Sequence, residues 1–420
     1  MSLWRDRDFL KYWSATVLGG FGNQVTFLAM PLVAVISLHA TATQTGVLRA
    51  TVSLPNLVFG LLIGVWVDRV RRHPLLIASA LGYAAILATV PLAALFHVLT
   101  LVQVYAVSFA AGSAGLVGWM AATAYVPTLI GRERLVEANS KVATTGSTIQ
   151  IVGPGAAGVL VQLVTAPIAV VADAVLEVGA ALIYVTIRRP EPPPARGRRR
   201  RVLEEVAEGV RAVARHRFLR LIVLIVGSFN FFSGLAQAVF VLFMVRELRL
   251  PPATIGLVFA VTGPGALIGA LLAPRLARRV GMGWTIMLGG LLFGTGWAVT
   301  PLASGSRPVA TLILMAGQLA LFTGSMVANI NLGSLRQAIT PDRLQGRVQA
   351  SMLLVVQGVV PPAALLGGVL GQSFGLRPAL GVAAIGSLLA MAFLATSPLR
   401  RLRTVADAGA VGQSAGVEQA

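Results

Sequence analysis

Two acidic residues, Asp173 and Glu177, are the side chains best placed for chemistry in this sequence, four positions apart inside an apolar run from Ala166 to Ile187. No other Asp or Glu lies as deep in a hydrophobic stretch. On a helix this spacing puts both carboxyls on one face. An acidic group at the centre of a bilayer costs roughly 2.5–3.5 kcal/mol. Because an ionisable group is so expensive there, the pair is a candidate functional site.

Two kinds of chemistry are open to this pair. Burial favours the neutral form of a carboxyl, and a like charge nearby disfavours double ionisation. We therefore expect Glu177, supported by Asp173, to bind and release a proton or to attract a cationic substrate. The structural alternative is that Asp173 hydrogen-bonds to a neighbouring helix and Glu177 stays neutral and passive.

The elements that must position these acids are membrane-spanning helices. Hydrophobic residues make up 56% of the chain and charged residues 12%, whereas a soluble protein has about 25% charged residues. A spanning helix needs about 20 apolar residues. Twelve such runs occur, at 12–37, 44–66, 75–96, 99–125, 141–163, 167–187, 218–244, 253–273, 284–303, 309–331, 350–371 and 376–396. The sequence therefore predicts an all-α membrane protein with twelve transmembrane helices.

The net charge of +19 is explained by topology. With the N-terminus in the cytoplasm and the spans alternating, the Lys and Arg residues gather on the inner side, as the positive-inside rule requires. Only five of the 34 fall outside: Arg49, Arg246, Arg249, Arg307 and Arg377. Both termini are therefore predicted to be cytoplasmic, and the expected partner of the chain is the lipid bilayer and not nucleic acid. Arg49 is expected to snorkel or to form an outer gate contact.

The segment 188–217 is the one long polar interruption, and it divides the spans into six and six. It begins with prolines, which end a helix. Valines at helical spacing follow and predict an amphipathic helix, either on the membrane surface or as a solvated linker. The predicted domains are an N-terminal six-helix bundle at 1–187, a cytoplasmic linker with this helix at 188–217, a C-terminal six-helix bundle at 218–400 and a disordered tail at 401–420.

The two halves resemble each other. Arg134 and Leu135 are matched by Arg343 and Leu344 at an offset of 209 residues, and similar glycine pairs recur at other positions. Pseudo-symmetric six-span repeats are a transporter architecture in which a midplane site between the repeats opens to each side in turn.

A short motif near the end of the second span supports this architecture. It reads Gly64-Val-Trp-Val-Asp68-Arg69-Val-Arg71-Arg72, and the second half keeps Arg275 and Arg278 of a degenerate copy. This motif resembles the signature of the major facilitator superfamily, between spans two and three. The resemblance implies a conformational lock formed by Gly64, Asp68, Arg69, Arg72, Arg275 and Arg278.

A second stretch, from Leu335 to Val348, resembles the branch of that superfamily that contains bacterial macrolide-efflux proteins and the enterobactin exporter. The resemblance implies a monomeric antiporter that exchanges protons for small amphipathic molecules, drug-, antibiotic- or siderophore-like, across the bacterial inner membrane by alternating access. Asp173 matches an Asp common in the sixth span of this branch. Two antiporter features are missing: Ser108 stands where an Arg is usual, and Ile149 where a Gly is usual.

The same resemblance implies that spans one, four, seven and ten line a central substrate cavity. The candidate lining residues are Asn23, Phe27, Trp119, Tyr125, Asn230, Gln237 and Asn329. A mostly apolar cavity with a few amides suits amphipathic ligands. The alternative for the amides is hydrogen bonding between helices.

Several functions are excluded or left open. The chain has no cysteine, neither lysine fits a Walker A loop, and the four histidines lack metal-ligand spacing. We therefore predict neither an enzyme nor a cofactor or metal site. An uptake carrier or facilitator of the same fold, and a membrane sensor that does not transport, stay open as alternatives.

Overall fold

The computed structural model describes residues 3–67, 69–191 and 202–404, which contain helices and no strand. Eleven helical stretches are long and apolar enough to cross a membrane. The 26-residue helix α2 (Ala42–Val67) occupies the remaining predicted position. The twelve predicted spans are therefore all helical, and the all-α membrane fold is confirmed. Asp68 and most of the predicted tail lie outside the described residues.

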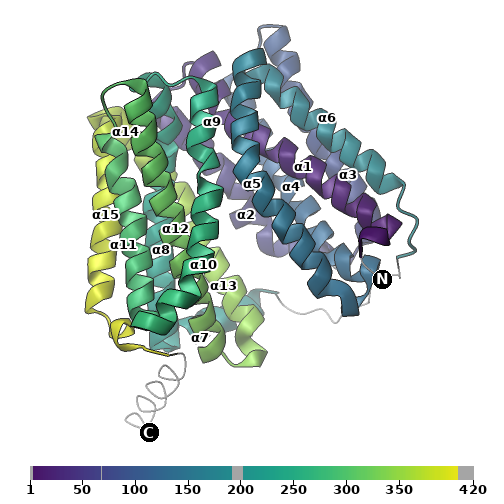
Figure 1. Cartoon of the computed structure of the whole chain (residues 1–420). Coiled ribbons are helices and arrows are strands. Elements are labelled where there is room, and N and C mark those ends of the chain that lie inside the picture. The colour runs from purple at the N-terminus through teal and green to yellow at the C-terminus, as the bar shows by residue number, and fades with distance from the viewer. Residues whose placement is uncertain (1–2, 68, 192–201, 405–420) are drawn as a thin grey trace. The chain divides into compact units, whose positions relative to one another are not determined.

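The helices fall into two compact units, one of Met1–Arg199 with Met244–Ala260 and one of Arg200–Phe243 with Val261–Ala420. Figure 1 labels their helices along the chain. Besides α2, unit 1 contains α1 (Arg7–Leu32), α3 (Arg72–Leu95), α4 (Leu101–Ile130), α5 (Leu135–Val164), α6 (Ala166–Val185) and α9 (Pro252–Ala260). Unit 2 contains α7 (Val202–Arg215), most of α8 (Arg217–Arg246), α10 (Thr262–Val280), α11 (Met282–Val299), α12 (Arg307–Ile339), α13 (Gln345–Gly358), α14 (Val360–Phe374) and α15 (Leu376–Thr396).

The helix α9 joins unit 1 because it packs closely on α5. A side chain at Gly158 of α5 would overlap the backbone of Pro252 and Gly256, so only glycine permits this approach. The backbone amide of Ala253 also donates to Gln162 Oε1 at 3.2 Å.

Proline accounts for the breaks within two predicted spans. The span at 253–273 is divided into α9 and α10 at Val261, shortly before Pro264. The span at 350–371 is divided into α13 and α14 at Val359, before Pro361. A proline inside a helix removes one hydrogen bond and clashes with the preceding turn.

In unit 1, α1 packs against α5 and α6, and α3 packs against α4 and α6. Aromatic rings pack together at the end of unit 1 where α1 begins. The ring centroids of Tyr12 and Tyr125 are 6.4 Å apart, and those of Tyr12 and Tyr184 are 6.3 Å apart. Phe9 and Leu129 complete a buried cluster around them. This cluster holds α1 between α4 and α6 and so fixes which of its faces meets α6.

In unit 2, glycines bring α11 and α12 into backbone contact. A side chain at Gly296 would meet the Gly317 carbonyl, and one at Gly324 would meet the Gly289 carbonyl. Gly289 and Gly296 are seven residues apart on α11, and Gly317 and Gly324 are seven apart on α12. This spacing is two helical turns. Small residues at regular spacing allow close helix packing where lipid provides no hydrophobic driving force.

The amphipathic helix predicted in the linker is present as α7, and it packs against α13. Glu208 forms an ion pair with Arg347, and Gly209 lies so close to the Arg347 carbonyl and to Ser351 that a larger side chain would overlap both. After α15 the chain returns to α11, where the backbone amides of Met282 and Gly283 donate to the carbonyls of Arg403 and Leu402.

Candidate functional site

Asp173 is fully buried on α6 and faces α1 and α3. One carboxyl oxygen, Oδ2, accepts a hydrogen bond from the hydroxyl of Thr26 on α1 and another from the hydroxyl of Tyr83 on α3, at 3.3 Å. The other oxygen, Oδ1, has no hydrogen-bond partner among the described residues. The carboxyl group is therefore hydrogen-bonded through one oxygen, while the other oxygen is buried without a partner.

Glycines on α1 provide the space for both acids. A side chain at Gly22 would overlap Asp173 Oδ1, and one at Gly19 would come within 2.9 Å of Glu177 Oε1. Gly19 and Gly22 are three residues apart and share a face of α1, and Asp173 and Glu177 are four apart and share a face of α6. One face of α1 therefore meets one face of α6. Glu177 is half-buried.

This arrangement suits proton binding better than metal binding. The partners of Asp173 are two hydroxyls, and no group of three or more His, Cys, Asp or Glu that could hold a metal occurs among the residues that the structure describes. A buried carboxyl is most costly when it is charged and incompletely hydrogen-bonded. The buried, unpartnered Oδ1 is therefore a place where a proton relieves an unfavourable charge.

The two predicted cavity residues of α1 are both exposed. Asn23 lies on the helix face between Gly19 and Thr26, and its side chain is exposed. Phe27 is 49% exposed, and its ring meets Phe259 of α9 edge-on with centroids 5.6 Å apart.

The two predicted cavity residues of α4 behave differently from each other. Trp119 is 64% exposed. Tyr125 is fully buried in the aromatic cluster of unit 1, where its ring contacts those of Tyr12 and His73. Tyr125 is therefore a core residue, because the α4 face that carries it packs against α1 and α3 and does not face a cavity.

The three amides predicted to line the cavity in unit 2 bond within their own helices. Asn230 donates to the Val226 carbonyl at 2.9 Å, Gln237 to the Ser233 hydroxyl at 2.8 Å and Asn329 to the Ser325 hydroxyl at 3.2 Å. Each bond spans one helical turn. These bonds do not join one helix to another, and the remaining polar atoms of the amides are left for a ligand or water.

The predicted lock is only partly described. A side chain at Gly64 would make ordinary contact with Met120 Sδ at 3.9 Å. Arg69 is exposed, and Arg275 and Arg278 are exposed on α10, where Arg275 donates to the Leu271 carbonyl at 2.8 Å. Arg72 contacts an acid that the sequence did not single out.

This acid is Glu191, which follows α6 and caps the start of α3. Its carboxylate accepts from the backbone amides of Arg72 and His73, at 2.8 and 3.0 Å, and lies 3.8 Å from the Arg72 guanidinium. A carboxylate at a helix N-terminus satisfies free amides and complements the helix dipole.

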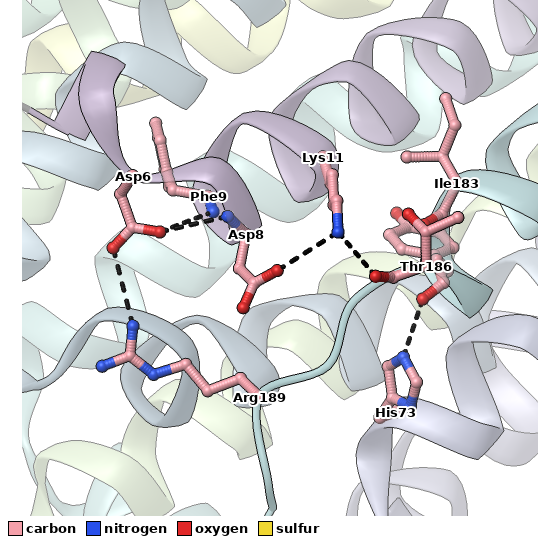
Figure 2. Close-up of polar contacts among 9 residues, drawn as sticks. Asp6, Asp8, Phe9, Lys11, His73, Ile183, Thr186 and Arg189 are labelled. Atoms are coloured by element: carbon pink, nitrogen blue, oxygen red, sulfur yellow. Dashed lines mark hydrogen bonds and ion pairs between the residues drawn. The ribbon is translucent and has the colours of Figure 1, made fainter.

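Figure 2 shows further contacts at the same end of unit 1, between the start of α1 and the chain after α6. Asp6 accepts from the backbone amides of Asp8 and Phe9 and lies 3.5 Å from Arg189. Lys11 donates to the Thr186 carbonyl at 2.6 Å. The chain that leaves α6 is therefore held on unit 1 as far as Glu191.

Three site residues were thus missed by sequence reasoning: Thr26, Tyr83 and Glu191. Thr26 had a visible signal, because it lies one turn after Asn23 on the same helix face. Glu191 is the one acidic residue between Glu177 and Glu204. Nothing in the sequence distinguished Tyr83.

Comparison with known proteins gives a consistent picture. The family model described as Major Facilitator Superfamily matches residues 12–364. The multidrug efflux pump Tap of Mycolicibacterium fortuitum is 25% identical over 86% of this chain and 89% of its own. The enterobactin exporter EntS of Salmonella typhimurium is 28% identical over 91% of each chain. The crystal structure of a mutant of the nucleoside transporter NupG superposes with a TM-score of 0.78 at 12% identity, covering 93% of this chain and 99% of that one.

Proposed function

Because the chain belongs to the major facilitator superfamily, and is thus a multi-pass membrane transporter and not an enzyme, we propose that it is a proton-coupled exporter of small amphipathic molecules. The cargo is drug-, antibiotic- or siderophore-like, and the exchange is proton antiport by alternating access. The setting that we propose is the bacterial inner membrane, with a monomer whose termini are both cytoplasmic.

The observation that supports this proposal best is the state of Asp173. Its carboxyl is fully buried, Oδ2 accepts from Thr26 and Tyr83, and Oδ1 has no partner among the described residues. Intramembrane acids of this kind mark proton pathways. Glu177 lies one turn further along α6 and supplies a second, less buried carboxyl through which a proton reaches or leaves Asp173.

In our proposal the proton is the switch between two conformations. A proton on Asp173 removes a buried charge and so stabilises conformations in which this group is shielded from water. When it leaves, the charged carboxyl favours conformations in which water or a hydroxyl reaches Oδ1. A transporter that binds substrate better in one of these conformations thereby couples proton entry to substrate exit.

Two relatives guide the choice of cargo and direction. Tap is named as a multidrug efflux pump and EntS as an enterobactin exporter. We extend export to this chain, together with the lock of Gly64, Asp68, Arg69, Arg72, Arg275 and Arg278 and the cavity positions Asn23, Phe27, Trp119, Asn230, Gln237 and Asn329.

Inverted membrane vesicles test the coupling. Susceptibility profiling of a strain that lacks the gene first identifies a compound that the protein exports. Respiration then acidifies the vesicle interior, and a pH-sensitive dye reports proton release when the compound is added. We expect release from vesicles with the wild-type protein and none with Asp173→Asn or Glu177→Gln, while exchange of labelled for unlabelled compound continues.

Unchanged coupling in both variants would end the proposal. Exchange that never responds to a proton gradient would identify a facilitator, and accumulation in the opposite direction would identify an uptake carrier. Absence of any exchange in the wild-type protein would favour a membrane sensor.

A further inference from the structure

A cavity of about 250 Å³ lies between α1 and α5 within unit 1. Its polar lining consists of Trp13, Thr16, Asn23, Gln24, Thr145 and Gln150. The volume is slightly below the range of about 300–1,000 Å³ that is usual for ligand pockets. The cavity therefore suits a compact molecule or one group of a larger molecule.

Close packing beside the cavity gives it a firm wall. The side chain of Ile149 fills the space at Gly20, and that of Gln24 fills the space at Gly153, so a larger residue at either glycine would overlap its partner. Trp13 is also fixed, because its indole nitrogen donates to the Thr145 hydroxyl at 2.9 Å. Trp13, Gln24 and Ile149 are thus held in place by packing or a hydrogen bond before a ligand arrives.

The lining carries hydrogen-bonding groups and no formal charge. Among the described residues that line the cavity there is no Asp, Glu, Lys, Arg or His. The hydroxyls of Thr16 and Thr145 donate to backbone carbonyls of their own helices. The side-chain amides of Gln24 and Gln150 extend the polar lining. Such amides favour a ligand that both donates and accepts hydrogen bonds.

The acids lie on a different face of α1. Gly19, Gly22 and Thr26 meet α6, where Asp173 and Glu177 are found, whereas Gly20 and Gln24 meet α5. Successive residues of a helix are about 100° apart, so Gly22 and Gln24 point in nearly opposite directions. Asp173, which packs on Gly22, therefore faces α1 on the side away from Gln24.

We propose that the α1–α5 cavity binds an uncharged amphipathic molecule, or an uncharged part of one, that carries amide, hydroxyl or carbonyl groups, and that it does not select organic cations. This inference rests on the proposed export function and names the class of its cargo. In this proposal the carboxyls on α6 bind the proton, and the substrate binds between α1 and α5. Asn23 is a positioning residue between them, since it lines the cavity and lies one turn before Thr26, which donates to Asp173.

Equilibrium binding to the purified full-length protein tests the assignment. Tritiated chloramphenicol is uncharged and has an amide and two hydroxyls, whereas tritiated tetraphenylphosphonium is a permanent cation without hydrogen-bonding groups. We expect saturable binding of chloramphenicol that is tighter than that of tetraphenylphosphonium. No saturable binding of chloramphenicol, or tighter binding of the cation, would overturn the assignment.

A steric variant locates the binding site. Gly146 lines the cavity, and no atom lies within 4 Å of the position of its missing side chain. Gly146→Leu therefore adds a side chain that begins in open space beside the cavity, and we expect chloramphenicol affinity to fall at least about tenfold. The matched control is Gly82→Leu, since Gly82 on α3 also has open space but lies outside the cavity. Unchanged affinity in Gly146→Leu would overturn the proposal.

A second variant keeps the test decisive if Gly146→Leu unfolds, which size-exclusion chromatography detects. Gln150→Leu removes one exposed amide at nearly constant size, and we expect chloramphenicol affinity to fall about threefold to tenfold. In that case unchanged affinity in Gln150→Leu would overturn the proposal. Binding is measured without a proton gradient. A negative binding result therefore contradicts the cavity assignment alone, and proton coupling is tested separately by the vesicle assay.

Discussion

The carboxyl group of Asp173 occupies the space that a side chain at Gly22 would fill. The two residues lie on α6 and α1, so the acid is buried at a close contact between these helices. A buried acid at a helix contact makes the separation of the two helices depend on its charge. This relationship connects the packing of unit 1 to the proposed proton coupling.

Replacing Gly22 by Ala should damage both packing and coupling. The added methyl group would overlap Asp173 Oδ1 and press on the α6 backbone, and overpacking of this kind costs about 1–3 kcal/mol. We expect a lower thermal unfolding temperature in detergent and loss of proton release in the vesicle assay. Gly82→Ala is the control, because its methyl group enters open space. Equal stability and coupling in the two variants would show that α1 and α6 do not need this close contact.

Thr26 and Asp173 should be energetically coupled. The Thr26 hydroxyl donates to Asp173 Oδ2, and Thr26→Val leaves that oxygen with Tyr83 as its remaining hydroxyl donor. We expect Thr26→Val to destabilise the protein by roughly 1–3 kcal/mol. In the Asp173→Asn background the loss should be smaller by at least about 0.5 kcal/mol. Equilibrium unfolding of the four proteins gives this coupling energy, and strictly additive losses would argue against the bond.

The sequence predicted the fold well because each span is a local hydrophobic run. The pairing of Asp173 with Glu177 was also predictable, since four residues on one helix share a face. Their partners were not, because Thr26 is 147 residues from Asp173 and Tyr83 is 90 residues away. Only the packing of α1, α3 and α6 brings these residues together.

Tyr125 shows where sequence reasoning reached its limit. It was predicted to line a cavity because it belongs to the fourth span, and the structure does contain that span as α4. The rotation of α4 about its own axis decides which of its faces is buried, and a uniformly apolar helix gives no periodic signal for that rotation. Trp119 is exposed on α4 while Tyr125 is fully buried.

Glu191 should stabilise the start of α3. Its carboxylate accepts from the backbone amides of Arg72 and His73, and loss of such a cap costs about 0.5–2 kcal/mol. We expect Glu191→Ala to speed amide hydrogen exchange in the first two turns of α3 and to leave the centre of α6 unchanged. Glu133→Ala, at an exposed position before α5, is the control. Equal exchange in both variants would show that the contribution of Glu191 is negligible.

Replacing Gly209 by Val should release α7 from α13. The new side chain would overlap the Arg347 carbonyl and the Ser351 hydroxyl, and a backbone carbonyl cannot move aside without bending α13. Arg211 and Arg215, both exposed on α7, then become better trypsin sites, because a protease needs a locally unfolded segment. We expect cleavage to accelerate about tenfold if roughly 1.4 kcal/mol of docking is lost. Gly381→Val, where the added side chain meets open space on α15, should be cleaved at the wild-type rate. If Gly209→Val is cleaved no faster than this control, α7 is held by something other than α13, and the membrane surface becomes the better explanation for its apolar stripe.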